Sequence, residues 1–273
     1  MKRFLVLFLV SLMVVVPCFN LAGISSAKAE ESNLDRIIDK GKITIAVFSD
    51  VVPFGYTDEK NELTGIDVDV ARGIAEALGV EVEFVPTTNA NRIPYLLSEK
   101  VDVVVAAFSM NAERRVVVEY SDPYFRGGAV LVLKKDNAKT AGVSSITDLS
   151  GLRISVSKGS LNDELATKLA GDKNEILRFD NVSDVYQALI DDKADALVED
   201  VVLAGYNIKT QYQGLTTAGE LLSVDAVGIG IRRGDQIFLN WLDGYVFDLL
   251  SSGKMADICA KYGVDYNPVN YVY

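Results

Sequence analysis

Two arginines and a distant aspartate could together hold a small zwitterion. Arg114 belongs to the segment that starts at Ser109, Arg92 comes earlier in the chain, and Asp200 comes much later. A guanidinium group binds a carboxylate through two parallel hydrogen bonds, and a carboxylate accepts hydrogen bonds from an ammonium group. These residue types predict a site for a free amino acid.

Each of these polar residues follows an apolar run that is typical of a buried strand. Arg92 comes after residues 80–85, Ser109 and Arg114 come after 101–107, and Asp200 comes after 194–198. In an open α/β sheet, ligands bind at the carboxyl ends of the parallel strands. We therefore expect the three segments to meet at one ligand-binding edge.

Apolar runs and amphipathic helical patterns alternate along most of the chain, which predicts an α/β fold with parallel strands. The expected strands are 43–48, 80–85, 101–107, 129–133, 153–156, 175–179, 194–198 and 224–231. The expected helices are 67–78, a helix beginning at 94–98, helices from about 162 and 183, and 237–250.

The strand and helix pattern repeats after residue 124, which predicts two lobes. We place the first lobe at 30–124 and 226–273 and the second lobe at 125–225. Two chain crossings, near 125–130 and 222–228, would form a two-strand hinge that absorbs a closing rotation. The alternative is one continuous doubly wound sheet.

The first 29 residues have the pattern of a signal peptide. Lys2 and Arg3 precede an apolar run over 4–16, and small residues surround Lys28, so we expect cleavage before Glu30. The apolar run is shorter than the roughly 20 residues of a membrane-spanning helix. The pattern predicts export to the periplasm or another extracytoplasmic space. An uncleaved anchor, or a lipid on Cys18, is the alternative.

Composition excludes several function classes. The net charge is −11, whereas nucleic-acid binding depends on a surplus of lysine and arginine. The sequence has no histidine, which excludes histidine-based catalytic triads, zinc sites with histidine ligands and histidine pH switches. After cleavage only Cys259 remains, so no intrachain disulfide is expected. We expect a monomer with no cofactor.

Several short motifs resemble those of the family 3 solute-binding proteins, which deliver polar amino acids to ABC importers. They include Pro53-Phe54-Gly55-Tyr56, Gly65-Ile66-Asp67-Val68-Asp69, Asn91-Arg92-Ile93-Pro94, Glu113-Arg114, Lys158-Gly159-Ser160, Glu199-Asp200 and Gly228-Ile229-Gly230-Ile231. The resemblance implies the two-lobe fold of type II periplasmic binding proteins. It also implies ligand capture by lobe closure and docking on a membrane permease.

The resemblance also implies roles for single residues. Arg114 would bind the ligand α-carboxylate, with a hydroxyl and a backbone N–H from Ser109. Ser160 would close on the same group from the second lobe, where a helix N-terminus favours an anion. Asp200 would accept the α-ammonium, and Ala107 would offer its carbonyl oxygen to it. Simple helix capping by Ser160 and strand-end capping at Ala107 are the alternatives.

Specificity depends on Arg92, Phe48 and Phe54 in this interpretation. In glutamate- and aspartate-type members an arginine in the context of Arg92 contacts the side-chain carboxylate, which predicts an acidic ligand. Phe48 stands where such members often have a basic residue, and Val51 stands where an aromatic residue is frequent. A more apolar pocket for a neutral polar amino acid is therefore the alternative. Glu199 is expected to face outward.

The same residues allow other functions. Some relatives of these binding proteins resemble cyclohexadienyl dehydratases, and the segment from Ser109 to Arg114 would suit such a lyase. That reaction needs a general acid, for which the sequence offers no candidate beside Asp200. A sensor domain is a third alternative. Asp67 and Asp69 could begin a metal site, but no third ligand accompanies them.

Overall fold

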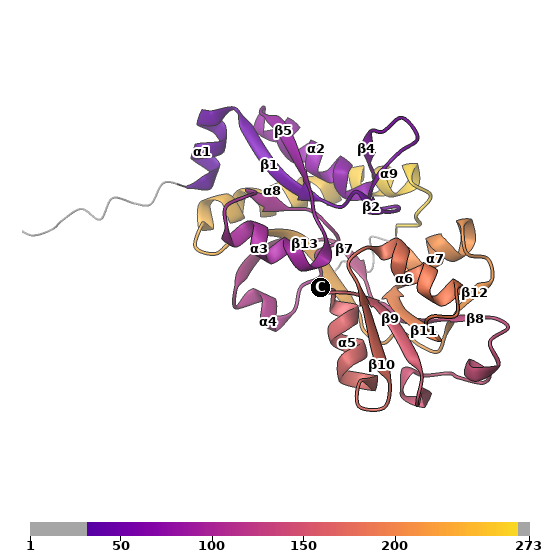
Figure 1. Cartoon of the computed structure of the whole chain (residues 1–273). Helices are drawn as coiled ribbons and strands as arrows, with labels where there is room; N and C mark the ends of the chain where they lie inside the picture. Colours follow the sequence, from indigo (N-terminus) through magenta and orange to yellow (C-terminus); the bar gives the residue numbers. More distant parts are fainter. Residues whose placement is uncertain (1–31, 267–273) are drawn as a thin grey trace, which may run out of the picture. The chain divides into compact units, whose positions relative to one another are not determined.

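The strands form two separate five-stranded sheets and one small sheet (Figure 1). The computed structural model describes residues 32–266, so the predicted signal peptide and Cys18 lie outside the described residues. These described residues belong to one compact unit. The two large sheets define the two lobes of that unit.

The first sheet has the strand order β5-β1-β6-β13-β7. Strand β1 is parallel to β5 and β6, whereas β13 is antiparallel to β6 and β7. The strands are β1 (Lys42–Val47), β5 (Glu81–Pro86), β6 (Val103–Val104), β7 (Val118–Gly127) and β13 (Asp225–Arg232). A small sheet of β2 (Asp50–Val51), β3 (Gly55–Thr57) and β4 (Leu63–Thr64) follows β1 in the chain.

The second sheet has the strand order β10-β9-β11-β8-β12. Strand β9 is parallel to β10 and β11, and β8 is antiparallel to β11 and β12. The strands are β8 (Ala129–Lys134), β9 (Arg153–Ser157), β10 (Glu175–Phe179), β11 (Ala196–Asp200) and β12 (Leu215–Ala218). The chain thus enters this sheet after β7 and leaves it before β13. The predicted α/β fold with two lobes is confirmed, and a single continuous sheet is excluded.

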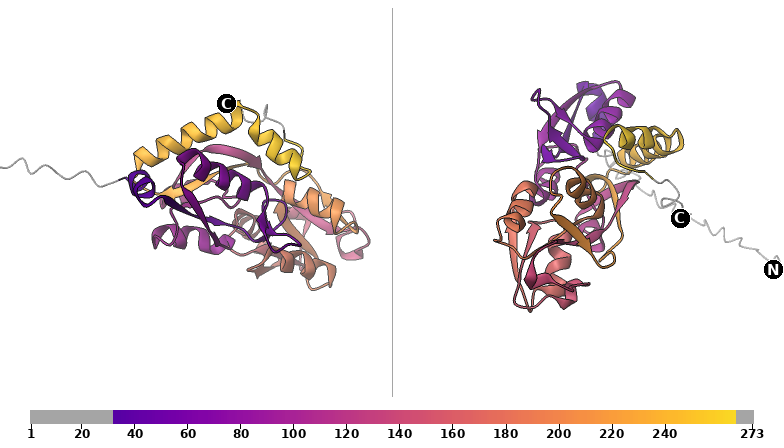
Figure 2. Two further views of the ribbon diagram at one scale, coloured as in Figure 1. Left: turned by 90° about the horizontal axis from the view of Figure 1, so that it is seen from above. Right: turned by 90° about the vertical axis from the view of Figure 1, so that its right-hand side faces the viewer.

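Helices surround both sheets (Figures 1 and 2). The main helices are α1 (Asn33–Lys40), α2 (Ile66–Leu78), α3 (Arg92–Leu97), α4 (Ala112–Arg115), α5 (Leu161–Ala170), α6 (Val182–Ile190), α7 (Val201–Thr210), α8 (Gln236–Ser251) and α9 (Lys254–Lys261). Helix α8 packs against β7, and α9 packs against α2. The C-terminal helices thus belong to the first lobe.

The apolar run 101–107 is the clearest departure from the predicted strands, because only Val103–Val104 pairs as a strand. The run is buried through Ala106, as expected. Ala107, however, has a positive φ of 39° and gives its N–H to the Asp67 carboxylate rather than to a strand. Apolar composition predicted the burial of this segment but could not predict where its ladder ends.

Both faces of strand β8, in the second sheet, are buried. Successive side chains of a strand point to opposite faces. Val130 and Val132 belong to the larger hydrophobic cluster, which also contains the first-lobe core. Ala129, Leu131 and Leu133 belong to a second cluster with α5 residues. The uninterrupted apolar sequence of β8 follows from this double burial.

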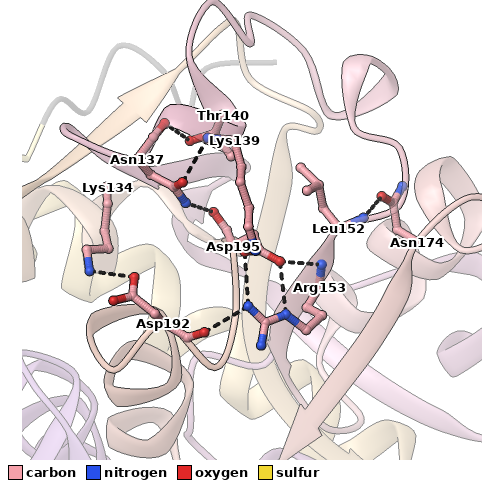
Figure 3. A network of polar contacts seen from close by, with 9 residues as sticks. All are labelled: Lys134, Asn137, Lys139, Thr140, Leu152, Arg153, Asn174, Asp192 and Asp195. Carbon is pink, nitrogen blue, oxygen red and sulfur yellow. Dashed lines mark hydrogen bonds and ion pairs between the residues drawn. The ribbon is translucent and has the colours of Figure 1, made fainter.

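A polar network holds the start of β11 (Figure 3). Asp195 is 3 % exposed, and its carboxylate accepts hydrogen bonds from the backbone N–H, Nε and Nη2 of Arg153, each at 3.0 Å, and from Lys139 Nζ at 2.9 Å. The Arg153 guanidinium holds the pKa of Asp195 well below its usual range. Because β11 ends at Asp200, this network fixes the strand that carries Glu199 and Asp200.

Gly65 determines how helix α2 begins. It has φ 127° and ψ 171°, a backbone region that is almost restricted to glycine. A Cβ at this position would lie 2.4 Å from the carbonyl oxygen of Phe54. The start of α2 therefore requires a residue without a side chain.

We expect Gly65→Ala to lower the free energy of unfolding by about 1–3 kcal/mol from backbone conformation alone, with the clash adding to this loss. Gly244→Ala is the matched control, because Gly244 lies within α8 and a Cβ there meets nothing within 4 Å. Alanine in a helix interior should raise stability by about 0.5–1 kcal/mol. Urea unfolding measures both variants, and equal stabilities would contradict this role of Gly65.

Candidate functional site

A cavity lies between the loops of the two lobes. The space between its walls, together with the solvent at its mouth, amounts to about 590 Å³. The first lobe lines it with Phe48, Val51, Phe54, Asn89, Arg92, Ala107, Ser109, Phe125, Asp225 and Val227. The second lobe lines it with Ser157, Ser160, Leu161, Asn162, Val182, Glu199, Asp200 and Leu203. Seven of the eight predicted site residues therefore lie around one cavity, and Arg114 is the one that does not line it.

Arg92 is a buried cation in the wall of this cavity. It is 2 % exposed, its Nη1 donates to the carbonyl oxygens of Ala106 and Ala107 at 3.0 Å each, and its Nε donates to that of Asn89 at 3.2 Å. Its guanidinium carbon lies 5.7 Å from the ring centre of Phe48. Burial first, and the charge of Arg114 second, lower the pKa of Arg92 to about 9.

Asp67 fixes the loop that supports Arg92. Its carboxylate accepts hydrogen bonds from Tyr124 Oη and from the Ala107 backbone N–H, both at 2.7 Å. Complete burial raises the pKa of Asp67 to about 7, although both hydrogen bonds oppose the rise. Asp69 is bound by Lys261, Tyr262 and Arg72. The described residues contain no group of three side chains that could hold a metal ion.

Arg114 lies at the boundary between the lobes, held on helix α4. Asn111 caps that helix, because its Oδ1 accepts the Arg114 backbone N–H at 2.7 Å. Arg114 Nη1 donates to the Ser109 carbonyl oxygen at 2.9 Å, and Nη2 donates to Gly159 O at 3.2 Å and Glu164 Oε1 at 2.8 Å. Gly159 and Glu164 belong to the second lobe. Arg114 therefore bridges the two lobes beside the cavity.

Ser160 both lines the cavity and caps helix α5. Its hydroxyl oxygen accepts the backbone N–H of Asp163 at 3.1 Å. The loop before it comes very close to the first lobe, because a Cβ on Gly159 would lie 3.0 Å from the Cα of Ala90. The N-terminus of α5 thus lies at the cavity, and its role in binding an anion stays a prediction.

Aromatic side chains make the apolar part of the wall. Phe54 and Phe125 are both buried, and their rings meet edge to face with centroids 5.5 Å apart. Phe48 is 2 % exposed and lies beside Arg92. These rings are packed in the core and also line the cavity.

Asp200 lies at the end of β11 and caps helix α7. Its Oδ1 accepts the backbone N–H groups of Val202 at 2.9 Å and Leu203 at 3.2 Å, and its Oδ2 accepts that of Gly128 at 3.2 Å. Loss of hydration raises the pKa of Asp200 to about 6, and these hydrogen bonds oppose the rise. The carboxylate has a fixed direction and retains acceptor capacity on Oδ2.

Glu199 corrects one prediction, because it is buried rather than facing outward. It is 4 % exposed and lines the cavity. Its Oε1 accepts the backbone N–H of Asp200 at 2.8 Å and Nδ2 of Asn162 at 3.1 Å, whereas Oε2 has no hydrogen-bond partner among residues 32–266. Burial is the main cause that raises the pKa of Glu199 to about 8.

Several cavity residues were missed by the sequence analysis. Ser157 Oγ, like Glu199 Oε2, is buried without a hydrogen-bond partner in the described part of the chain. Asn162, Asn89 and Asp225 also line the cavity. One signal could have found Ser157 and Glu199: each is a polar residue within the last two positions of a buried strand that ends at the binding edge. Two unpaired polar atoms at one cavity are suited to a polar ligand.

Two lobes with a polar cavity between the loop edges of their sheets define a type II periplasmic binding protein. The model of the bacterial extracellular solute-binding proteins, family 3, matches residues 43–265. The chain belongs to this family. No helix within residues 32–266 is long and apolar enough to cross a membrane.

Individual relatives include binding proteins and an enzyme. The chain is 31% identical to cyclohexadienyl dehydratase of Pseudomonas aeruginosa, over 68% of this chain and 69% of that protein. It is 26% identical to the L-cystine-binding protein TcyJ of Escherichia coli, over 93% and 96%. A solved ancestral amino acid-binding protein, a precursor of cyclohexadienyl dehydratase, superposes with a TM-score of 0.78 at 32% identity, covering 85% and 99%.

The raised pKa of Glu199 predicts a pH-dependent stability. The folded state holds the proton up to about pH 8, whereas the unfolded carboxyl loses it near its ordinary value of 4.5. Stability must therefore fall as the pH rises between these values, by at most about 1.4 kcal/mol per pH unit for this group. Glu199→Gln should remove this contribution, so that its stability relative to wild type increases with pH.

Urea unfolding at a series of pH values measures this difference. Glu175→Gln is the control, because Glu175 is an exposed glutamate of the same lobe. Parallel pH profiles for wild type and Glu199→Gln would contradict the burial of a protonated Glu199.

Proposed function

We propose that the protein binds a free L-amino acid outside the cytoplasm by closure of its two lobes and delivers it to the permease of an ABC transporter. Family membership supports a solute-binding role. The observation that carries the proposal is charge of both signs at one cavity, with Arg92 from the first lobe and Asp200 from the second. A zwitterion is the small solute that needs both. The exported location, the lobe boundaries near 125 and 225 and the monomeric state complete this proposal.

The α-ammonium group is assigned to Asp200. Its carboxylate is held by three backbone N–H groups, so it keeps its direction without a ligand. Asp225 lies on the same cavity and adds a second aspartate to its wall, and the protonated Glu199 adds a neutral polar group. The α-carboxylate is assigned to Ser109, to the N-terminus of α5 at Ser160, and to Arg114, which the Ser109 carbonyl holds beside the cavity.

An uncharged polar side chain fits the rest of the cavity better than an acidic one. Arg92 Nε and Nη1 already donate hydrogen bonds to backbone carbonyl oxygens. A ligand side-chain carboxylate could therefore not form two hydrogen bonds with either edge of the Arg92 guanidinium group. Glu199, Asp200 and Asp225 add three carboxyl groups to the wall. Glutamate and aspartate, the first choice from the sequence, become the alternative. Phe48 and Phe54 supply apolar surface for the ligand side chain.

Calorimetric titration with the twenty amino acids, on protein unfolded and refolded to remove bound ligand, tests this function. We expect at least one amino acid to bind, and Asp200→Asn to weaken it by about 2–5 kcal/mol, because the buried ammonium loses its charged partner. Asparagine also caps helices well, so helix α7 should persist. Asp172→Asn, an exposed change of equal charge, is the control. Unchanged affinity in Asp200→Asn would contradict the assigned ammonium site.

Glu199 gives a specific reason to keep a second candidate, a cyclohexadienyl dehydratase-like lyase. This reaction expels a hydroxyl group, which a general acid must protonate. Glu199 lines the cavity, has a free Oε2 among the described residues, and keeps its proton at neutral pH because its pKa is raised to about 8. The similarity to the Pseudomonas aeruginosa enzyme agrees with this candidate.

Incubation with prephenate, followed by phenylpyruvate absorbance, separates the two candidates. A binding protein should give no turnover with either wild type or Glu199→Gln. Turnover in wild type that is lost in Glu199→Gln would replace the binding function by the lyase.

A further inference from the structure

The most unusual contact at the site joins a buried arginine to an exposed glutamate of the other lobe. Arg114 is 6 % exposed, whereas the side chain of Glu164 on α5 is 47 % exposed. Glu164 Oε1 lies 2.8 Å from Arg114 Nη2, and Oε2 accepts Asn111 Nδ2 at 2.8 Å. Both oxygens of one carboxylate are therefore bound by neighbouring residues around α4.

The hydrogen bonds of Arg114 leave no complete fork for another carboxylate. A guanidinium has two bidentate edges, Nε with Nη2 and Nη1 with Nη2, so both edges need an N–H of Nη2. The two N–H groups of Nη2 point to Gly159 O and to Glu164 Oε1. In this arrangement Arg114 cannot grip an incoming carboxylate with two hydrogen bonds.

We propose that Glu164 sets the affinity of the site, because its carboxylate competes with the ligand α-carboxylate for Arg114. This inference rests on the proposed amino-acid-binding function and adds to it a residue that determines affinity. The ligand takes the position that Glu164 Oε1 holds on Nη2, and Glu164 turns into solvent.

Burial determines which partner leaves. Arg114 stays charged and nearly inaccessible, so it needs an anionic or carbonyl partner at every stage. Glu164 is half exposed and regains hydration when it moves away, so its departure has a low cost. The exchange therefore replaces one carboxylate by another at a fixed cation.

The exchange is coupled to the lobes. Gly159 and Glu164 both lie at the start of α5 in the second lobe, and Gly159 packs against Ala90 of the first lobe. In the open form α5 lies away from α4, so Nη2 is free of both acceptors and can bind the ligand carboxylate before the lobes close. The same contact that joins the lobes thus occupies the carboxylate site.

Glu164→Gln tests the proposal, because it removes the competing charge and keeps the shape of the side chain. Titration calorimetry with the tightest of the twenty amino acids should show binding about three- to tenfold tighter than in wild type. Spin labels on the two lobes should show a larger interlobe distance in this variant before ligand is added. Glu113→Gln is the matched control: Glu113 is next to Arg114, is exposed, and its side chain makes no hydrogen bond or ion pair within residues 32–266. This control should bind as wild type does.

The outcomes distinguish a failure of the proposed competition by Glu164 from a failure of the proposed amino-acid-binding function. Equal or weaker binding by Glu164→Gln, with wild-type protein binding normally, overturns the competition alone. Equal tightening in Glu113→Gln also overturns it, because the effect would then come from net charge near Arg114. Absence of binding in wild type and both variants, for all twenty amino acids, overturns the proposed function together with this inference.

Discussion

Buried charge has to be paired or neutralised, and this constraint organises the space between the two sheets. Several ionisable side chains lose most of their water there, and four of them show different ways of meeting the constraint. Arg92 is surrounded by carbonyl oxygens, and Asp67 is held by a tyrosine hydroxyl and a backbone N–H. Glu199 keeps its proton. Arg114 alone is balanced by a carboxylate from the other lobe.

These different solutions divide the site into a fixed part and an exchangeable part. Arg92 finds its hydrogen-bond acceptors within its own lobe. Asp200 is held by the first residues of α7 in its own lobe and by Gly128 at the predicted hinge. A displacement of the lobes leaves the contacts of Arg92 and those of Asp200 with α7 intact. The contacts of Arg114 with Gly159 and Glu164 cross between lobes and must change with any such displacement. In the proposed mechanism the fixed groups, Arg92 and Asp200, orient the solute. The ion pair of Arg114 and Glu164 exchanges when the solute binds and so couples binding to the movement of the lobes.

The sequence predicted the fold better than it predicted the chemistry of the site. Hydrophobic periodicity and turn-forming residues were sufficient to predict the bounds of two elements. Helix α2 ends at Gly79, which has a left-handed conformation, and the predicted and observed bounds of β10 agree. The same signals failed for 101–107, where strand pairing ends at Val104 and the Ala107 backbone N–H binds the Asp67 carboxylate instead of a neighbouring strand. Helices α7 and α9 were not predicted. The apolar residues of α7 show little helical periodicity, whereas those of α9 follow a clear helical pattern that was overlooked.

The ligand-binding roles of the named site residues stay predictions, but the structure shows where these residues lie. Seven of the eight named residues line the cavity. Glu199 was misplaced because strand alternation alone does not reveal that both faces of β11 are covered. The contact of Glu164 with Arg114 could not be predicted, since it joins residues far apart in sequence through the relative position of two lobes.

A crystal structure of the protein with its tightest-binding amino acid tests the central claim most directly. We predict that the ligand carboxylate occupies Arg114 Nη2, that Glu164 has left it for solvent, and that the ammonium group lies on Asp200. A complex in which Glu164 still binds Arg114 while the ligand carboxylate is held elsewhere in the cavity would contradict the account.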